Sequence, residues 1–139
     1  METIKIKITK GDEYTRTIAT IALCQINPRT RIFQSWGVEK RICIYVNDMP
    51  ALGLLVNGFI HKGWVFVALN EGTDTYEVFT AKTNTKAQTI EVVKHIDDVY
   101  CDMLTETIDG MVEKDQSWTD EEYEEKIDEW LATTSYSYM

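Results

Sequence analysis

The chain has 139 residues, a formal net charge of −9, and 44 % hydrophobic against 27 % charged residues. That length fits one domain that can bury a core without disulfides or metals, and four Trp, seven Tyr and four Phe are too many aromatics for a disordered chain. No apolar run reaches the roughly 20 residues that cross a bilayer, and "METIKIKITK" lacks a signal or transit pattern. We therefore expect a single cytoplasmic domain over residues 1–139, with no membrane association.

The N-terminal region predicts a strand and then a helix. "TIKIKIT", residues 3–9, alternates strictly, which indicates a half-buried strand, and Asp12 can cap a following helix. Residues 13–26 fit either element, because their threonines favour a strand. A helical face would hold Tyr14, Ile18, Ile21, Ala22 and Gln25. We prefer a helix that ends at Asn27-Pro28, since the residue before a proline avoids the helical region.

The middle of the chain predicts a run of antiparallel strands. "TRIFQSWG" is expected to be a short extended or irregular stretch, and Met49-Pro50 is expected to break the first strand after it. His61-Lys62 lies between two apolar runs and indicates a hairpin turn. The expected strands are Glu39–Asp48, Leu52–Ile60, Gly63–Asn70 and Thr75–Lys82, with "QTIEVV" as a possible further strand.

From about Asp97 the hydrophobic period becomes helical, and Asp97 or Asp98 can cap the start. The expected apolar stripe is Tyr100, Met103, Leu104, Thr107, Ile108 and Met111. A second helix follows over "SWTDEEYEEKIDEWLA", and residues 133–139 are expected to be a frayed tail. The predicted fold is therefore α+β: an antiparallel sheet of four to six strands packed with two C-terminal α-helices, with a possible short N-terminal helix.

The charge is unevenly distributed, with +3 over residues 1–90 and −12 over residues 91–139. The last predicted helix has an outer acidic face of Glu121, Glu124, Glu125 and Asp128, whose surroundings include like-charge pairs at i,i+4 spacing. Such pairs cost about 1–2 kcal/mol together. Three interpretations stay open: the charge keeps the protein soluble, it meets a basic partner protein or imitates nucleic acid, or it pairs with basic residues of the same chain.

A basic-aromatic stretch gives an alternative function. It consists of Arg29, Arg31, Phe33, Trp36, Lys40 and Arg41. Cations interleaved with aromatic rings are what single-stranded nucleic acid binding uses, because cations contact phosphates and rings stack on bases. The simpler interpretation is a solvated sheet edge with core aromatics, where Lys and Arg discourage pairing between edges.

Few residues of the sequence are candidates for catalysis or for binding an ion. Glu71 and Asp74 share a loop and could act as acid and base or hold a cation, although a solvated turn is the simpler interpretation. An enzyme would need them to converge with His61 or Asp48 in a deep pocket. The three cysteines are expected to be reduced, small apolar side chains. We predict neither a metal nor a cofactor, and the preferred function is a non-enzymatic interaction or regulatory module that uses the acidic face.

One resemblance bears on the setting. The region from "SWGVEKRI" through "MPALGLLVNGFIHKGWVFVALNEGTDTYEV" to "DDVYCDML" resembles small uncharacterised proteins of gut Bacteroides and their mobile elements. The resemblance covers about two-thirds of the chain. It implies a bacterial cytoplasm and transfers no activity and no site residues.

Overall fold

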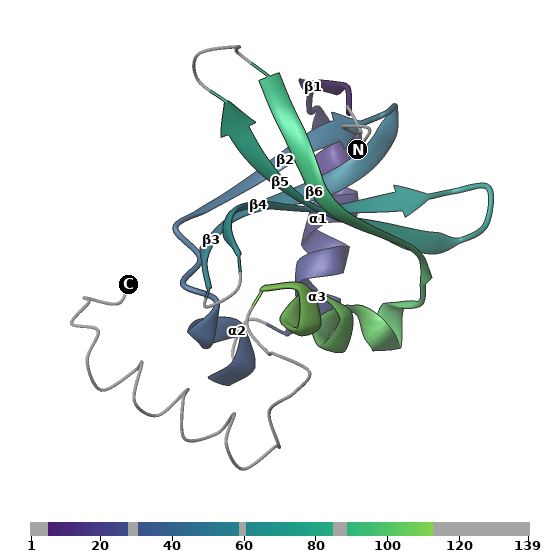
Figure 1. Cartoon of the computed structure of the whole chain (residues 1–139). Coiled ribbons are helices and arrows are strands. Elements are labelled where there is room, and N and C mark those ends of the chain that lie inside the picture. Colours follow the sequence, from purple (N-terminus) through teal and green to yellow (C-terminus); the bar gives the residue numbers. More distant parts are fainter. Residues whose placement is uncertain (1–5, 28–30, 59–60, 85–88, 113–139) are drawn as a thin grey trace.

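The computed structural model describes residues 6–27, 31–58, 61–84 and 89–112. They form one six-stranded antiparallel sheet in which every strand pairs with its neighbours in the sequence (Figure 1). The strands are β1 (Ile8–Lys10), β2 (Lys40–Val46), β3 (Met49–Asn57), β4 (Lys62–Asn70), β5 (Thr75–Asn84) and β6 (Thr89–Val99). The helical elements are α1 (Glu13–Ile26), α2 (Arg31–Ser35), the 3-10 turn η1 (Cys101–Met103) and α3 (Leu104–Val112).

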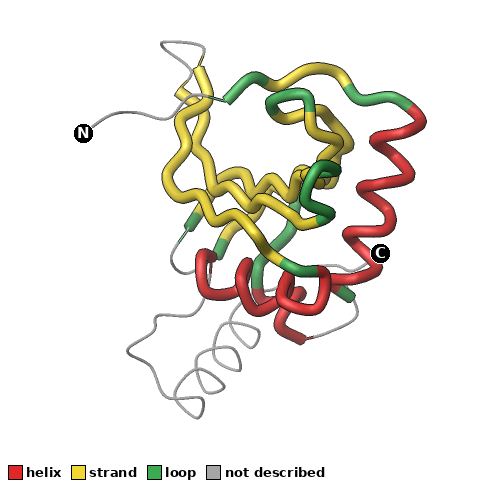
Figure 2. The backbone as a smooth tube through the Cα atoms, turned by 90° about the vertical axis from the view of Figure 1, so that its right-hand side faces the viewer, coloured by secondary structure: helices red, strands yellow, loops and turns green. Residues whose placement is uncertain are grey.

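The sheet is strongly curved and separates two apolar clusters (Figure 2). On the helix face, α1 packs against β2 and β3, while α3 packs against β5 and β6. The buried side chains there include Ala22, Ile26, Leu52, Leu54, Val65, Val67, Val78, Leu104 and Ile108. The second face buries Ile44, Val46, Ala51, Phe66, Ala68, Phe79 and Ala81. The predicted antiparallel sheet packed with helices is therefore confirmed.

The helix over residues 13–26 is confirmed, and the Asp12 side chain caps it by accepting a hydrogen bond from the Thr15 backbone N–H at 3.0 Å. The face predicted for it was wrong by about one position. Its buried residues are Thr15, Ala19, Ala22 and Ile26, whereas Tyr14 and Ile21 are each 46 % exposed. Small side chains are turned to the sheet because α1 lies directly over β3.

Two expectations for the middle of the chain were wrong. Residues 31–35 are the short helix α2 rather than an extended stretch, because one helical turn brings Phe33 and Trp36 together into the core. Met49-Pro50 begins β3 instead of ending the preceding strand. The turn is Asn47-Asp48, with φ of 49° and 67°, a left-handed pair that suits a two-residue hairpin.

The change from strand to helix occurs later than expected. β6 continues through Asp97 and Asp98 to Val99, so neither aspartate caps a helix; Tyr100 is the residue before η1. Leu104, Ile108 and Met111 are buried as predicted, whereas Tyr100 and Met103 are exposed. One C-terminal helix, α3, is described, and the predicted helix over residues 117–132 lies outside the described residues.

Candidate interaction groove

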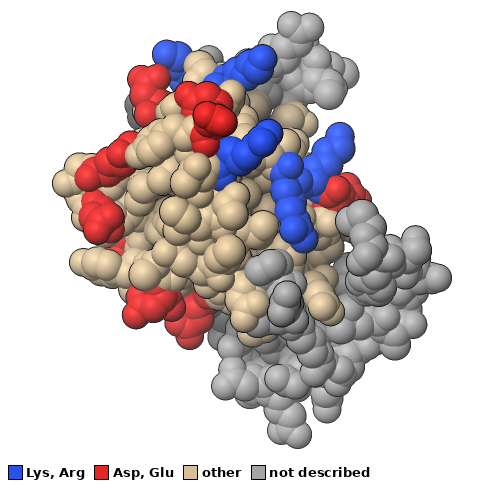
Figure 3. All heavy atoms as spheres, turned by 180° about the vertical axis from the view of Figure 1, so that it is seen from behind, with Lys and Arg blue, Asp and Glu red and all other residues tan. Residues whose placement is uncertain are grey.

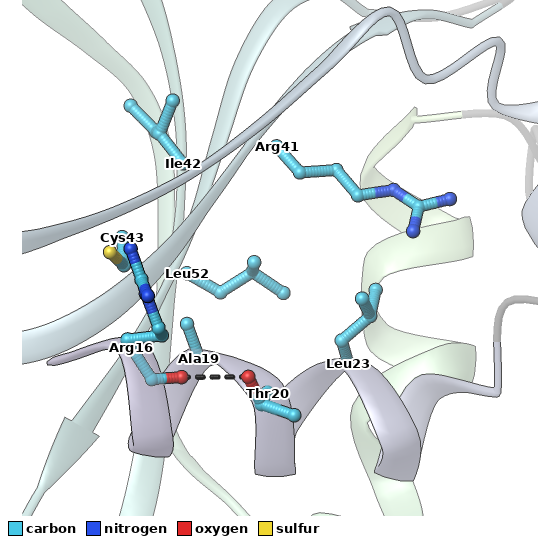
Figure 4. A pocket seen from close by; sticks show the side chains of 8 residues that line it. All are labelled: Arg16, Ala19, Thr20, Leu23, Arg41, Ile42, Cys43 and Leu52. Carbon is cyan, nitrogen blue, oxygen red and sulfur yellow. Dashed lines mark hydrogen bonds between the residues drawn. The ribbon is translucent and has the colours of Figure 1, made fainter. Parts of the chain in front are cut away.

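An open groove of about 480 Å³ runs between α1 and β2 on the helix face. Its lining residues are Arg16, Ala19, Thr20 and Leu23 from α1, Arg41, Ile42 and Cys43 from β2, and Leu52 from β3. Figure 4 shows Arg16 and Leu23 on the α1 wall and Arg41 on the opposite β2 wall, with Leu52 between the two walls. The groove therefore combines an apolar floor with two guanidinium groups, which suits a polypeptide segment with apolar and acidic side chains.

The position of α1 beside β2 is fixed at one end by Gly11 and Asp12. A Cβ added at Gly11 would overlap the carbonyl oxygen of Cys43 and lie 2.6 Å from the Thr15 hydroxyl, so only glycine allows this approach. The hydroxyl of Tyr45 on β2 donates a 2.8 Å hydrogen bond to the Asp12 carboxylate. The Thr15 N–H and, secondly, this Tyr45 hydroxyl lower the pKa of Asp12. The start of α1 is thus tied to the edge of the sheet.

The Arg41 side chain, which lines the groove, also contacts α2. The Arg41 guanidinium carbon lies 5.5 Å from the centre of the Phe33 ring, which is a cation–π distance. The Phe33 ring in turn packs against Trp36, with ring centres 5.3 Å apart. The indole N–H of Trp36 donates a buried 2.9 Å hydrogen bond to Asp109 of α3. The Arg41 side chain is therefore held over the groove by a helix that is itself anchored in the core.

β2 presents an uncovered edge along this groove. β1 pairs only with Ile44, Tyr45 and Val46, and the chain then turns at Gly11 into α1. Among the described residues, no strand lies beside Lys40, Arg41 or Ile42 on that side. Pairing of β2 with β3 continues without a register shift from Lys40 to Val46, so the hydrogen-bonding groups of this edge are regularly spaced.

The cations and the aromatic rings of the basic-aromatic stretch lie in different environments. Lys40 and Arg41 are exposed on the open edge, which agrees with the interpretation as a solvated edge. Phe33 and Trp36 are 4 % and 0 % exposed, so their ring faces are not available for stacking on bases. Arg31 begins α2, and Arg29 lies outside the described residues. Of the expected nucleic-acid surface, the structure shows the cations of β2 and not the rings.

Basic side chains gather on one part of the rear face, and acidic side chains lie mainly along its other side (Figure 3). The described residues that line the groove include Arg16 and Arg41, and none of them is Asp or Glu. Neither guanidinium forms an ion pair with a described residue. The groove therefore carries positive charge that the described part of the fold does not neutralise. The predicted acidic face at Glu121, Glu124, Glu125 and Asp128 lies outside the described residues.

The residues of the enzyme hypothesis do not converge. Asp48 is in the β2–β3 turn and forms an exposed 3.6 Å ion pair with Lys7, whereas Glu71 accepts a 2.7 Å hydrogen bond from the Tyr14 hydroxyl. His61 lies in the β3–β4 connection, at the opposite end of the strands. Burial lowers the pKa of His61, which favours the neutral ring. Its Nε2–H donates a 3.0 Å hydrogen bond to the Trp64 carbonyl. Each of these three side chains has a structural partner, and His61 lies at the other end of the strands from Asp48 and Glu71.

The described residues include no group of three His, Cys, Asp or Glu side chains that could hold a metal ion. All three cysteines are free, but Cys24 and Cys101 are exposed, so only half-buried Cys43 packs against the core as expected. No helix in the described part of the chain is long and apolar enough to cross a membrane.

Sequence reasoning identified Lys40 and Arg41 but missed the groove itself. Arg16, Ala19 and Leu23 had no visible motif, since they lie on α1 and meet β2 only through the fold. The signal that was available is the regular strand Lys40–Val46 next to a shorter partner strand. In comparisons with known proteins, no family model matches the chain, and no curated protein or solved structure matches it.

Proposed function

We propose that the protein is a non-enzymatic interaction module that binds a segment of a partner protein in the α1–β2 groove. The observation that supports this is the regular edge of β2 beside an apolar floor and two guanidinium groups, an edge that no strand covers and charges that no ion pair neutralises among the described residues. Peptide-binding domains commonly use a groove between a sheet edge and a helix, because the edge supplies main-chain hydrogen bonds and the helix supplies side-chain contacts.

The experiment is a selection from a displayed random-peptide library on the immobilised protein. The selected peptides are then compared on two variants of α1, Thr20→Trp and Thr17→Trp. Both threonines are exposed, and the hydroxyl of each donates a hydrogen bond to the backbone carbonyl four residues earlier. Of the two, Thr20 lines the groove and Thr17 does not. We expect Thr20→Trp to abolish binding and Thr17→Trp to preserve it. If no peptide is enriched, or if both variants bind equally well, the groove is not the interaction site.

A second proposal concerns the acidic face at Glu121, Glu124, Glu125 and Asp128, and it is supported by the charge of −12 over residues 91–139. A basic partner protein is the expected occupant, because a row of carboxylates attracts basic surfaces. Replacing the four acids with Gln and Asn should reduce the recovery of partners from the native host. If the recovery of partner proteins is unchanged, this face serves only to keep the protein soluble. The groove variants provide the matched comparison, since they leave these four residues intact.

A further inference from the structure

We infer that the groove takes an acidic, extended peptide segment that adds to β2 as an antiparallel strand. This inference rests on the proposed function, and it adds the binding mode and the chemistry of the partner.

The direction of the backbone groups in β2 supports strand addition. In an antiparallel strand, the N–H and C=O of one residue point to the same side. Asn47 donates its N–H to the Lys7 carbonyl at 2.8 Å, and the Cys43 carbonyl faces Gly11, so alternate residues of β2 point away from β3. Arg41 belongs to this set, and β1 has ended before reaching it. Its N–H and C=O therefore point out over the open edge, where an added strand can pair with both.

The two faces of β2 determine which side chains the added strand carries. Arg41 is opposite Leu54 on the helix face, whereas Ile42 is opposite Gly53 on the second face. Residues that pair across antiparallel strands have their side chains on the same face. The peptide residue opposite Arg41 therefore enters the groove that Arg16 and Arg41 help to line. The next residue lies beside Ile42, which is 37 % exposed.

Charge selects the partner. A carboxylate opposite Arg41 enters a groove whose described lining includes two guanidinium groups and no Asp or Glu, so it is attracted by positive charge. Lys40 and Arg41 also disfavour pairing between the β2 edges of two copies, because this would place cations opposite cations. The same charges that protect the edge against self-association favour an acidic strand. The expected pattern is an acid facing the groove and an apolar residue facing Ile42, in alternation.

The test uses fluorescence anisotropy with a labelled peptide of alternating Glu and Val, at low and at physiological salt. We expect binding that weakens with salt, and about tenfold weaker binding in Arg16→Gln and in Arg41→Gln. Lys94→Gln is the matched control, because Lys94 is an exposed cation on the helix face of the opposite edge strand, paired with Thr80. Equal binding of a Lys-Val peptide, or no binding of the Glu-Val peptide, would overturn the acidic specificity.

Strand addition is tested by N-methylation of the same peptide. The Glu residues are the ones whose backbone groups face Arg41, so methylating their amides should weaken binding by about tenfold, while methylating the Val amides should leave it unchanged. Equal effects of the two methylations would overturn the pairing. An oligo-dT that binds more tightly than the peptide and loses binding in Arg16→Gln and Arg41→Gln would assign the groove to nucleic acid. If library peptides still depend on Thr20 while the Glu-Val peptide fails, the proposed function stands and this inference does not.

Discussion

The two edges of the sheet are built differently. β6 has two register shifts against β5, between Tyr76 and Val78 and between Thr80 and Ala81, and Asp98 has a φ of 53°. β2 runs without a shift, and β1 covers only its C-terminal part. Bulges twist an edge and interrupt its row of hydrogen-bonding groups, which protects it from pairing. We therefore expect β6 to resist pairing with another strand, and β2 to be the edge strand that can accept one.

The largest effect is expected at the junction that shapes the open edge. Gly11→Ala would drive a Cβ into the Cys43 carbonyl, so β1 or α1 must move away from β2. We expect a loss of about 3 kcal/mol in the free energy of unfolding, measured by chemical denaturation. Gly110→Ala is the control, because nothing lies within 4 Å of its added Cβ and alanine favours α3 by about 1 kcal/mol. Equal stability of Gly11→Ala and wild type would contradict this tight junction.

Thiol labelling reports directly on the groove. Cys43 lines it and is half-buried, whereas Cys24 and Cys101 are exposed. In variants with a single cysteine, we expect Cys43 to react with iodoacetamide about tenfold more slowly than either of the others. A peptide bound in the groove should slow Cys43 further and leave Cys101 unaffected. If Cys43 and Cys101 react equally fast without peptide, the assigned burial of Cys43 is wrong. If bound peptide does not slow the reaction of Cys43, the peptide does not bind in the groove.

A smaller effect is expected at Asp12. Because the Thr15 N–H and the Tyr45 hydroxyl lower its pKa below the ordinary value of 3.8, the charged form stabilises the folded state. This contribution is complete above the ordinary pKa and is lost as the pH falls through the lowered one. Asp12→Asn should therefore be less stable than wild type at pH 7, by less than Gly11→Ala, and the difference should disappear in acid.

Thermal unfolding of Asp12→Asn as a function of pH checks the sign of this effect. Asp48→Asn is the control, since Asp48 lies in an exposed turn with an exposed Lys7 partner. Its stability should differ little from that of wild type at any pH. A difference between Asp12→Asn and wild type that grows in acid would contradict the assigned role.

The smallest expected effect is on peptide affinity, when one exposed apolar residue is replaced on each of the two edge strands. Ile42 on β2 and Val93 on β6 are both exposed, at 37 % and 57 %. Ile42→Thr should weaken binding of the Glu-Val peptide by about threefold, because it removes apolar contact with the added strand. Val93→Thr should leave binding unchanged. If Val93→Thr weakens binding and Ile42→Thr does not, the peptide adds to β6 and the comparison of the edges is wrong.

Much of the fold was predictable from local patterns. The alternation of Ile42, Ile44 and Val46 located β2, the apolar runs on either side of His61-Lys62 located β3 and β4, and Asp12 located the start of α1, because these signals depend on side chains a few residues apart. The errors occurred where distant contacts outweigh local preference. α2 is helical because Phe33 and Trp36 must both reach the core, and β6 extends past Asp98 because β5 provides its partner as far as Tyr76.

The candidate site was predictable only in part. The cations of β2 were recognised, but their aromatic neighbours were assigned to a surface that the structure buries. Arg16 carried no signal, because its importance depends on where α1 crosses the sheet. Likewise Asp109, which is not part of the predicted apolar stripe of its helix, is buried and accepts a hydrogen bond from the indole N–H of Trp36.

By itself, the sequence determined the class of fold, most of the strands and the division of charge between the two halves of the chain, because each of these follows from composition or from short-range periodicity. Only the tertiary structure decided which edge stays open and what lies beside it. That decision depends on the early end of β1 at Gly11, whose contact with Cys43 directs α1 along β2. Such a contact joins residues far apart in the chain, so no local pattern encodes it.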